Sequence, residues 1–369
     1  MKRIARFCFA AALSVVSVLL LPSVWVNAQA YVETFASTGT QGVTSHFNRP
    51  RAVFSDGDSL VFILDTENNL IRYVGYDNIY TLAGRLSEIG GGFVPIGAHQ
   101  DGRIDEALFN RPTAGLVHQD GRIFILDSAN HSLRVIDPES GTIGNFAGGE
   151  QGHQNGAITR ARFNNPFAMA ADARGNIFIA DTDNHVIRRV NMNTGNVTTI
   201  AGTPGRPGMR DDRNDRALFD SPMGIAVSPD GRTIFVADTG NHLIRVIRNN
   251  HVSTLAGTFT EAAEAGWGRG DTVPIGGFAD GESAMFDQPM GLQLFYGYII
   301  VADSANHMIR KISAEGYVTT LAGTGYPGYA DGEPLDAEFH FPSGLYIKGN
   351  ILLIADTENN IIRSLPLGR

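Results

Sequence analysis

Four histidines stand at the same place in a recurring octapeptide, and imidazole is the side chain best suited to bind metals or move protons near neutral pH. They are His131, His185, His242 and His307. A zinc site would need several such side chains to converge on one point. In the first and last copies of the octapeptide, however, Asn69 and Asn360 occupy this place. Because asparagine replaces histidine with the rest of the pattern intact, we predict a shared hydrogen-bonding role in a turn and no metal at these positions.

Other residues with catalytic potential form no recognisable pattern. The acidic run 211–215 could hold calcium, but it lacks the regular alternation of known calcium loops, so we interpret it as a solvated connector. The sequence has no G-x-S-x-G turn, no Walker loop and no G-x-G-x-x-G opening a helix. The histidines outside the octapeptide are scattered: His46, His99, His118, His153, His251 and His340. We therefore predict no catalytic residue, no metal and no cofactor, and we favour a binding protein over an enzyme.

The octapeptide itself occurs six times, and its spacing indicates the architecture. The Asp residues that open the copies are 62, 54, 57, 65 and 53 residues apart, a period typical of propellers and solenoids. The Asp, Asn and Arg positions are Asp65, Asn68, Arg72, Asp127, Asn130, Arg134, Asp181, Asn184, Arg188, Asp238, Asn241, Arg245, Asp303, Asn306, Arg310, Asp356, Asn359 and Arg363. We interpret them as structural. Asp and Asn bond to turn backbone, Asn tolerates a left-handed backbone, and the Asp and Arg side chains would form a belt of salt bridges that could join adjacent blades.

The segments around each octapeptide predict β-strands. In the third copy, residues 166–171, 176–180, 186–190 and 197–202 are short, rich in Ile and Val, and separated by turn residues. A Phe-x-x-Pro motif precedes the first segment of every copy, and a small residue follows two positions after its proline: Ala52, Ala114, Ala168, Gly224, Gly291 and Gly344. Small residues suit innermost strands that crowd around an axis. We predict an all-β, six-bladed β-propeller with four antiparallel strands per blade.

The outer strand of the sixth blade is expected at the other end of the sequence. Residues 31–37 resemble residues 251–257 and 317–323, which follow the third strands of earlier blades. We expect this N-terminal strand to complete the last blade and close the ring without an open sheet edge. Residues 31–369 then form a single propeller domain.

The combined pattern resembles the NHL repeat. Leu-Ala-Gly, a Gly-rich loop with Asp-Gly, Ala-x-Phe-x-x-Pro and Asp-Thr-x-Asn-His-x-Ile-Arg recur over residues 31–369. The resemblance implies a six-bladed NHL propeller. It does not choose a function, because such propellers include extracellular sensor domains, RNA-binding platforms and a zinc lyase. A metal-dependent lyase or hydrolase outside the cytoplasm is therefore the alternative to a binding role.

Residues 1–30 have the form of a secretory signal. Lys2, Arg3 and Arg6 precede an apolar stretch that ends at an A-x-A site, with cleavage expected after Ala28 or Ala30. An uncleaved membrane anchor is the alternative. Cleavage would remove the single cysteine, and it would change the net charge from −9 to −12 because the segment holds three basic residues and no acidic one. We predict a secreted or extracytoplasmic protein that binds neither nucleic acid nor, after cleavage, the membrane.

Two links between blades are much longer than the others. Residues 84–109 and 257–286 give links of 25 and 29 residues, against 10 to 17 elsewhere, and both contain Val-Pro-Ile-Gly. They fall three blades apart, so we expect links 85–108 and 258–285 to face each other as walls at the channel mouth. Long loops on a rigid scaffold are common binding sites, although a duplicated insertion without a ligand is the alternative. The candidate binding residues are Trp267, Pro95, Pro274, Phe93 and Arg269. The partner would be an extracytoplasmic protein, peptide or glycan.

Overall fold

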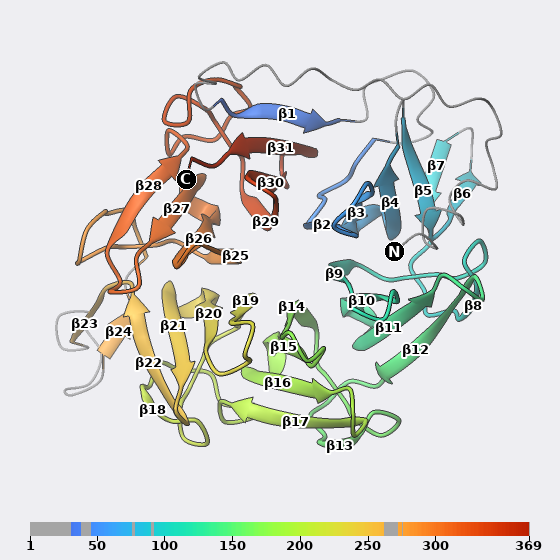
Figure 1. Cartoon of the computed structure of the whole chain (residues 1–369), viewed down its shortest axis with the longest axis horizontal. Coiled ribbons are helices and arrows are strands. Elements are labelled where there is room, and N and C mark those ends of the chain that lie inside the picture. Colours follow the sequence, from blue (N-terminus) through green and yellow to red (C-terminus); the bar gives the residue numbers. More distant parts are fainter. Residues whose placement is uncertain are drawn as a thin grey trace.

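The computed structural model describes residues 31–37, 46–75, 78–89, 92–261, 272–274 and 276–368. Six antiparallel sheets follow one another around a central opening in chain order (Figure 1). The predicted all-β, six-bladed propeller is therefore confirmed. Within the described ranges, no helix has both the length and the apolar character needed to span a bilayer.

Each blade contains four antiparallel strands, which follow one another in order from the axis to the rim. The innermost strands are β2 (Ala52–Ser55), β9 (Pro112–Val117), β14 (Pro166–Ala171), β19 (Gly224–Val227), β25 (Pro289–Phe295) and β29 (Pro342–Lys348). The second strands are β3 (Val61–Asp65), β10 (Ile123–Asp127), β15 (Ile177–Asp181), β20 (Ile234–Asp238), β26 (Tyr298–Asp303) and β30 (Ile351–Asp356).

The outer half of each blade follows the same order. The third strands are β4 (Leu70–Val74), β11 (Ser132–Asp137), β16 (Val186–Asn191), β21 (Leu243–Arg248), β27 (Met308–Ile312) and β31 (Ile361–Pro366). The fourth strands are β5 (Ile79–Ala83), β12 (Thr142–Gly148), β17 (Asn196–Ala201), β22 (His251–Ala256), β28 (Val318–Ala322) and, in the sixth blade, β1 (Glu33–Ala36).

Three blades carry a fifth, two-residue strand that the sequence did not predict. These strands are β8 (Gly102–Arg103), β13 (Gly156–Ala157) and β18 (Asp212–Arg213), and each comes from the link that enters its blade. The residue just before each strand explains the pairing, because its side chain accepts hydrogen bonds from the outer edge of the blade. Asp101 accepts the backbone N–H of Asn145 at 3.1 Å, and Asp211 accepts that of Thr254 at 2.8 Å.

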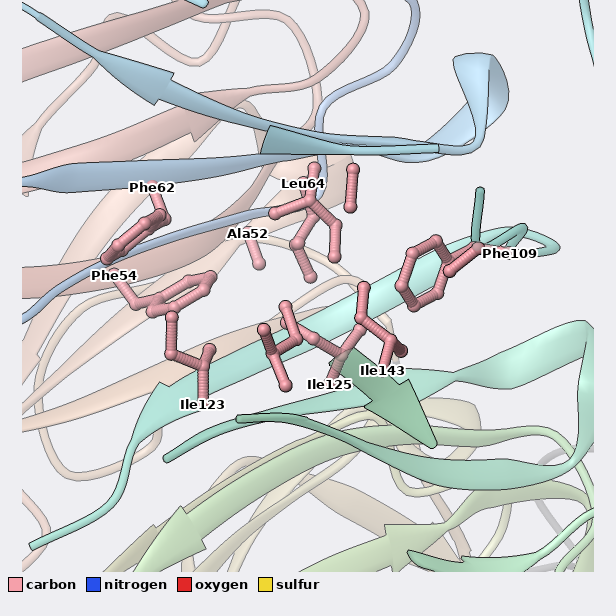
Figure 2. Close-up of a cluster of buried hydrophobic side chains, with 12 residues drawn as sticks. Ala52, Phe54, Phe62, Leu64, Phe109, Ile123, Ile125 and Ile143 are labelled. Carbon is pink, nitrogen blue, oxygen red and sulfur yellow. The ribbon is translucent and has the colours of Figure 1, made fainter. Parts of the chain in front are cut away.

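The hydrophobic core lies between neighbouring blades. Figure 2 shows Phe54, Phe62 and Leu64 of the first blade above Ile123 and Ile125 of the second. The rings of Phe54 and Phe62 stack with centroids 5.1 Å apart, and Phe62 is completely buried. Each blade therefore buries its apolar face against the next blade, and the ring provides one such partner for every sheet.

The small residues of the innermost strands are required by close backbone contact, as predicted. A Cβ added at Gly224 would lie 1.8 Å from the carbonyl oxygen of Met290, and one at Gly344 would lie 2.2 Å from that of Arg51. Met290 belongs to the innermost strand of the blade after that of Gly224, and Arg51 directly precedes the innermost strand of the blade after that of Gly344. Strand packing around the axis thus leaves no room for a side chain at these positions.

The ring closes through the N-terminal strand, which confirms the prediction. Strand β1 pairs antiparallel with β31, and Glu33 lies opposite Ser364. Thr34 donates its backbone N–H to Asp331 at 3.1 Å, which is the contact that Thr254 makes with Asp211 in the fourth blade. Val32 is completely buried in the core. The N-terminal segment therefore reproduces the outer strand of the other blades.

Removing residues 31–38 from the mature protein should lower its stability. The deletion exposes the outer edge of β31 and removes the buried side chains of Val32 and Ala36. We expect a loss of at least about 3 kcal/mol of unfolding free energy, or about 5–10 °C in Tm, followed by circular dichroism. A deletion variant that melts like the full mature protein would show that the strand does not close the ring.

Candidate functional site

The octapeptide forms the turn between the second and third strands of each blade. Five copies contain a single 3-10 turn: η2 (Thr66–Asn68), η3 (Ser128–Asn130), η4 (Thr182–Asn184), η5 (Thr239–Asn241) and η6 (Ser304–Asn306). The residue after this turn has a left-handed backbone in all six copies, with φ between 54° and 58°. The left-handed position is thus the fifth residue, histidine or asparagine, and not the Asn at the fourth. Both residue types are enriched in this conformation.

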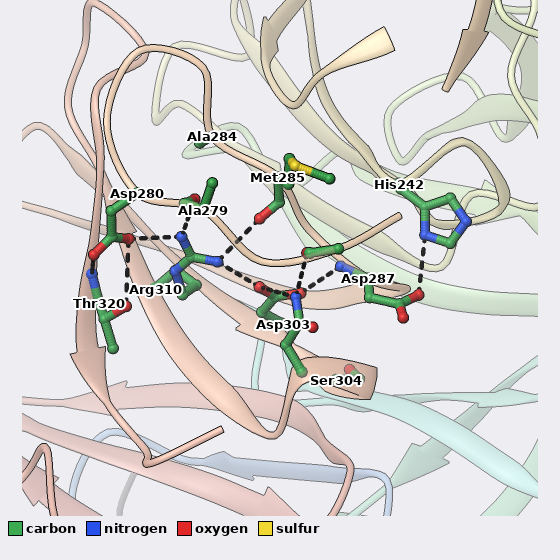
Figure 3. Close-up of polar contacts among 12 residues, drawn as sticks. His242, Ala279, Asp280, Ala284, Met285, Asp287, Asp303, Ser304, Arg310 and Thr320 are labelled. Atoms are coloured by element: carbon green, nitrogen blue, oxygen red, sulfur yellow. Dashed lines mark hydrogen bonds and ion pairs between the residues drawn. The ribbon is translucent and has the colours of Figure 1, made fainter. Parts of the chain in front are cut away.

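Arg310 shows how the octapeptide is held (Figure 3). Its Nη1 donates to Asp303 at 2.6 Å and to the carbonyl of Met285 at 3.1 Å. Its Nη2 donates to the carbonyl of Ala279 and to Asp280, both at 2.6 Å. Asp280 belongs to the link that enters the blade, so a single guanidinium ties together the turn, the link and the sheet.

The same pairing of Asp and Arg occurs in every blade. The Asp–Arg distances lie between 2.6 and 3.1 Å, and the paired side chains are at most 2% exposed. Each Arg also lies over the Phe of the Phe-x-x-Pro motif, with 5.1–6.0 Å between the guanidinium carbon and the ring centroid. The pairs form within one octapeptide, so the salt bridges do not join adjacent blades.

Burial raises the pKa of the carboxylates in these pairs. It raises the pKa of Asp127, Asp181, Asp238 and Asp303 to about 6, while the Arg, the Asn side chain and a backbone N–H act in the opposite direction. The carboxylates are therefore ionised at neutral pH. Removing one partner of such a buried pair typically costs about 3–5 kcal/mol, because the other charge is left without compensation.

The second octapeptide residue connects each blade to the next. Its hydroxyl donates to the carbonyl of the Phe-x-x-Pro proline in the following blade, at 2.6–2.9 Å in all six copies. Thr357 makes this bond to Pro50, across the point where the ring closes. These hydroxyls therefore have a structural role, because each one holds two adjacent blades together.

The fifth residue makes a second bond between blades. Asn69 and Asn360 accept the backbone N–H of the residue before the next proline at 2.7 Å through Oδ1. The four histidines accept the same N–H at 3.0–3.1 Å through Nδ1. The predicted shared hydrogen-bonding role is confirmed, although the bond crosses to the next blade. In this bond Nδ1 is the acceptor, which is the role of an imidazole nitrogen that carries no proton.

The surroundings of His131 and His307 disfavour protonation. Burial is the main cause of the lowered pKa of His131, and the nearby Asp183 opposes it. Burial also lowers the pKa of His307, with His340 adding to the effect and Asp287 opposing it. A proton on Nδ1 would in addition remove the acceptor of the bond between blades.

Two side chains that the sequence offered as possible ligands, Asp211 and His153, each contact a different part of the protein. In the part of the chain that the structure describes, no three His, Cys, Asp or Glu side chains form a group that could hold a metal. Asp211 of the acidic run binds Arg245 at 2.5 Å. His153 contacts the hydroxyl of Thr199 at 2.8 Å, and burial lowers its pKa to about 4.

A central channel of about 390 Å³ passes between the innermost strands. The residue after each Phe-x-x-Pro proline lines it at the end where the links enter: Arg51, Thr113, Phe167, Met223, Met290 and Ser343. We call these six residues the mouth ring. Unlike the octapeptide, the mouth ring differs from blade to blade, so it is a place where this protein has its own chemistry.

Arg51 is the charged member of the mouth ring. Its guanidinium carbon lies 5.5 Å from the centroid of the Phe167 ring, two blades further on, so the side chain extends across the mouth. Its Nε is buried and has no hydrogen-bond partner among the described residues. Burial lowers the pKa of Arg51, and the neighbouring Arg111 adds to this effect while Glu67 and Glu358 oppose it.

The neighbouring charges are already paired. Arg111 binds Glu67 at 2.9 Å and Arg49 binds Glu358 at 3.0 Å. Arg51 is thus the unpaired cation in a group of three arginines and two glutamates. The sequence analysis missed it, although the signal was present: Arg51 stands where the other copies have an uncharged residue.

The two long links form hairpins at opposite sides of the ring (Figure 1). Strand β6 (Leu86–Ile89) pairs with β7 (Gly92–Pro95), and β23 (Phe259–Glu261) pairs with β24 (Thr272–Pro274). Both lie at the rim, outside the fourth strands, and not at the channel mouth as expected. The inserted residues extend an outer segment of each link, which is why they project outward.

Three of the five candidate binding residues lie in the strands of these hairpins. Pro95 ends β7 opposite Leu86, and Pro274 ends β24 opposite Phe259, so the repeated tetrapeptide has the same place in both hairpins. Phe93 lies in β7 opposite Glu88. Trp267 and Arg269 lie outside the described residues. Val94 and Phe259 are 46% and 45% exposed.

The repeated turn, the six sheets and the ring closure define a six-bladed propeller built from one repeating unit. The sequence pattern of the Teneurin NHL domain matches residues 31–248. The protein therefore belongs to this NHL-repeat family.

Relatives with this domain are much longer proteins. Protein SUPPRESSOR OF QUENCHING 1, chloroplastic, of Arabidopsis thaliana is 29% identical over 282 residues, which cover 73% of this chain and 26% of that protein. NHL repeat-containing protein 2 of Homo sapiens is 29% identical over 134 residues, covering 34% of this chain and 18% of that protein. This chain thus spans about a quarter or less of the length of these relatives.

Solved structures share the fold at low sequence identity. An auxiliary nutrient binding protein from Bacteroides ovatus has a TM-score of 0.64 at 14% identity and covers 92% of this chain and 77% of that one. Virginiamycin B lyase from Staphylococcus aureus has a TM-score of 0.52 at 12% identity, covering 91% and 99%. These similarities establish the propeller architecture.

Replacing His185 with Asn should preserve the fold. Asparagine would accept the backbone N–H of Ser221 as Asn69 accepts that of Arg111, so we expect a cost of at most about 1 kcal/mol. His185→Ala leaves that N–H without its partner and should cost about 1–3 kcal/mol. Urea unfolding measures both. Equal stability of the two variants would contradict the role assigned to the imidazole.

Acidification should destabilise the protein through His131 and His307. Their pKa is lowered in the folded state, so the unfolded chain binds more protons below its own value of about 6.5, and stability falls as pH drops from about 7 toward the folded pKa. The buried Asp residues, whose folded pKa is raised, contribute with the opposite sign below pH 6. The double variant His131→Asn/His307→Asn keeps the Asp contribution, so its unfolding free energy should fall less than that of wild type between pH 7.5 and 5.5. Parallel pH profiles would exclude this assignment.

Proposed function

We propose that the protein is exported and acts as a binding module for a protein, peptide or glycan outside the cytoplasm. Residues 1–30 would direct export and be removed, leaving residues 31–369 as one propeller domain. The partner would bind on the face that carries the links between blades. A net charge of −9, or −12 after cleavage, disfavours nucleic acid as the partner.

The observation that carries this proposal is the pair of hairpins. Links of 15–17 residues connect other blades, so the additional residues of the 25- and 29-residue links are not needed to build the ring. Each hairpin exposes an apolar side chain, Val94 in β7 and Phe259 in β23. Exposed apolar side chains often mark a surface that contacts a partner. Since the ring does not need the hairpins that carry them, we assign the contact surface to the hairpins. Trp267 and Arg269, with Phe93, Pro95 and Pro274, would supply the specific contacts.

The relationship to known propellers is compatible with this role. The octapeptide residues are used for turns, salt bridges and contacts between blades, which leaves the links to provide specificity. The structural neighbours named as nutrient-binding proteins support a ligand-binding use of the same scaffold. The link 258–285 contains acidic residues, including Glu264 and Asp271, and these favour a cationic or polyhydroxyl partner.

Trp267→Ala should weaken partner binding without affecting the fold. Trp267 is the only tryptophan of the mature chain, so its fluorescence reports on this hairpin alone. We would titrate the mature protein with soluble peptidoglycan fragments, with neutral oligosaccharides and with basic peptides. The probe that gives a saturable change should bind Trp267→Ala about 1–2 kcal/mol more weakly, with Tm unchanged.

Two controls make this test decisive. Trp267→Phe keeps an aromatic contact and should lose less affinity than Trp267→Ala. A lower Tm for Trp267→Ala would mean that the side chain holds the insertion in place, and the binding surface would have to be reassigned. Elemental analysis of the purified protein addresses the lyase or hydrolase alternative, because one zinc or calcium ion per chain would contradict a purely binding role.

A further inference from the structure

The channel mouth contains a cation without a counter-ion. The Nε of the Arg51 side chain is buried and has no hydrogen-bond partner among the described residues, whereas the two neighbouring arginines are bound to Glu67 and Glu358. The buried Nε is the key group, since a buried donor that is left without an acceptor costs free energy. An acceptor placed at the mouth would remove this cost.

The other polar groups of the mouth ring do not offer a competing donor. Thr113 donates its hydroxyl to the carbonyl of Phe167 at 2.8 Å. Ser343 is directed at the carbonyl of Arg51 at 3.4 Å and contacts the hydroxyl of Thr357 at 2.6 Å. The available recognition group is therefore the guanidinium, and the matching ligand group is one that only accepts hydrogen bonds. An ionised carboxylate has this property and fits the planar fork of arginine.

Below the mouth, most of the side chains that line the channel are apolar. Its walls include Ala114, Ala168, Ile225, Leu292 and Leu345. A volume of about 390 Å³ lies in the range of small-molecule sites. Of the polar lining residues, Gln293 is bound to the carbonyl of Leu345 at 3.0 Å. The channel thus suits the apolar part of a small molecule whose charged end remains at the mouth.

We propose that Arg51 binds the carboxylate of a small amphipathic monoanion whose apolar part enters the central channel. The site is distinct from the hairpins at the rim and goes beyond the proposed role in partner binding. A monoanion fits because the group of three arginines and two glutamates has one uncompensated positive charge. The guanidinium carbon lies 5.5 Å from the centroid of the Phe167 ring, a cation–π contact that uses a face of the guanidinium and none of its N–H donors.

Hexanoate is a suitable probe, with hexanamide as the uncharged control of the same shape. In calorimetric titrations of the mature protein, hexanoate should bind at least tenfold more tightly than hexanamide. Arg51→Gln should lower hexanoate affinity at least tenfold and leave hexanamide binding unchanged. Hexanoate should also shift the arginine Nε–H resonance that disappears from the nitrogen–proton spectrum of Arg51→Gln.

A matched variant tests whether general positive charge is enough. Glu67→Gln/Arg111→Gln removes a neighbouring ion pair without changing net charge, and it should bind hexanoate like wild type. Arg51→Lys keeps the charge but lacks Nε, so it should lose at least fivefold in affinity, and it serves as the second variant if Arg51→Gln does not fold.

Three results would overturn the proposal. They are no measurable hexanoate binding, equal affinity for hexanoate and hexanamide, and wild-type affinity in both Arg51 variants. Tighter binding of inorganic phosphate than of hexanoate would also overturn it, because the ligand class would then be wrong. Each result leaves the hairpin test with Trp267 unaffected.

Discussion

The buried Asp–Arg pair is the interaction on which the rest of each blade depends. The carboxylate organises the octapeptide turn through the Asn side chain and the backbone N–H that follows the Phe of Phe-x-x-Pro, as Asp303 does with Asn306 and Asp287. The guanidinium then binds the link that enters the blade. Because both charges are excluded from water, the pair is only favourable when all these partners are in place. The buried Asp–Arg pair therefore recurs in all six blades, through Nη1 of the arginine in five of them and through Nε of Arg72 in the first.

This arrangement also divides the surface into two kinds of residue. In the octapeptide, the hydroxyl and the imidazole or amide side chains contact the following blade, so they hold the ring together. Residues that vary between copies are not required for these recurring contacts between blades. The hairpins at the rim and the mouth ring at the axis belong to this second kind, and chemistry specific to this protein is expected there. A rigid repeat can therefore support different ligands in related proteins without a change of fold.

The architecture could be predicted from the sequence because its determinants are periodic. Octapeptide spacing, the small residues at Gly224 and Gly344, and the match of residues 31–37 to other outer strands each have one structural explanation. The position of the hairpins could not be derived in this way. Link length shows that residues are added, but whether they project toward the axis or the rim depends on where in the link the insertion begins. Arg51 was missed for a different reason, since a search for recurring residues passes over a position whose residue differs from copy to copy.

Closure by β1 has a consequence for how the chain assembles. The contact between Thr34 and Asp331 joins residues 297 positions apart, so the last sheet is completed only when the two ends of the domain come together. Until then the outer edge of β31 is unpaired. A second copy of the chain carries the same strand and can insert it at that edge, so two molecules that exchange β1 would each have a complete sixth sheet. Refolding at high protein concentration therefore favours strand-exchanged dimers, and dilution favours closed monomers.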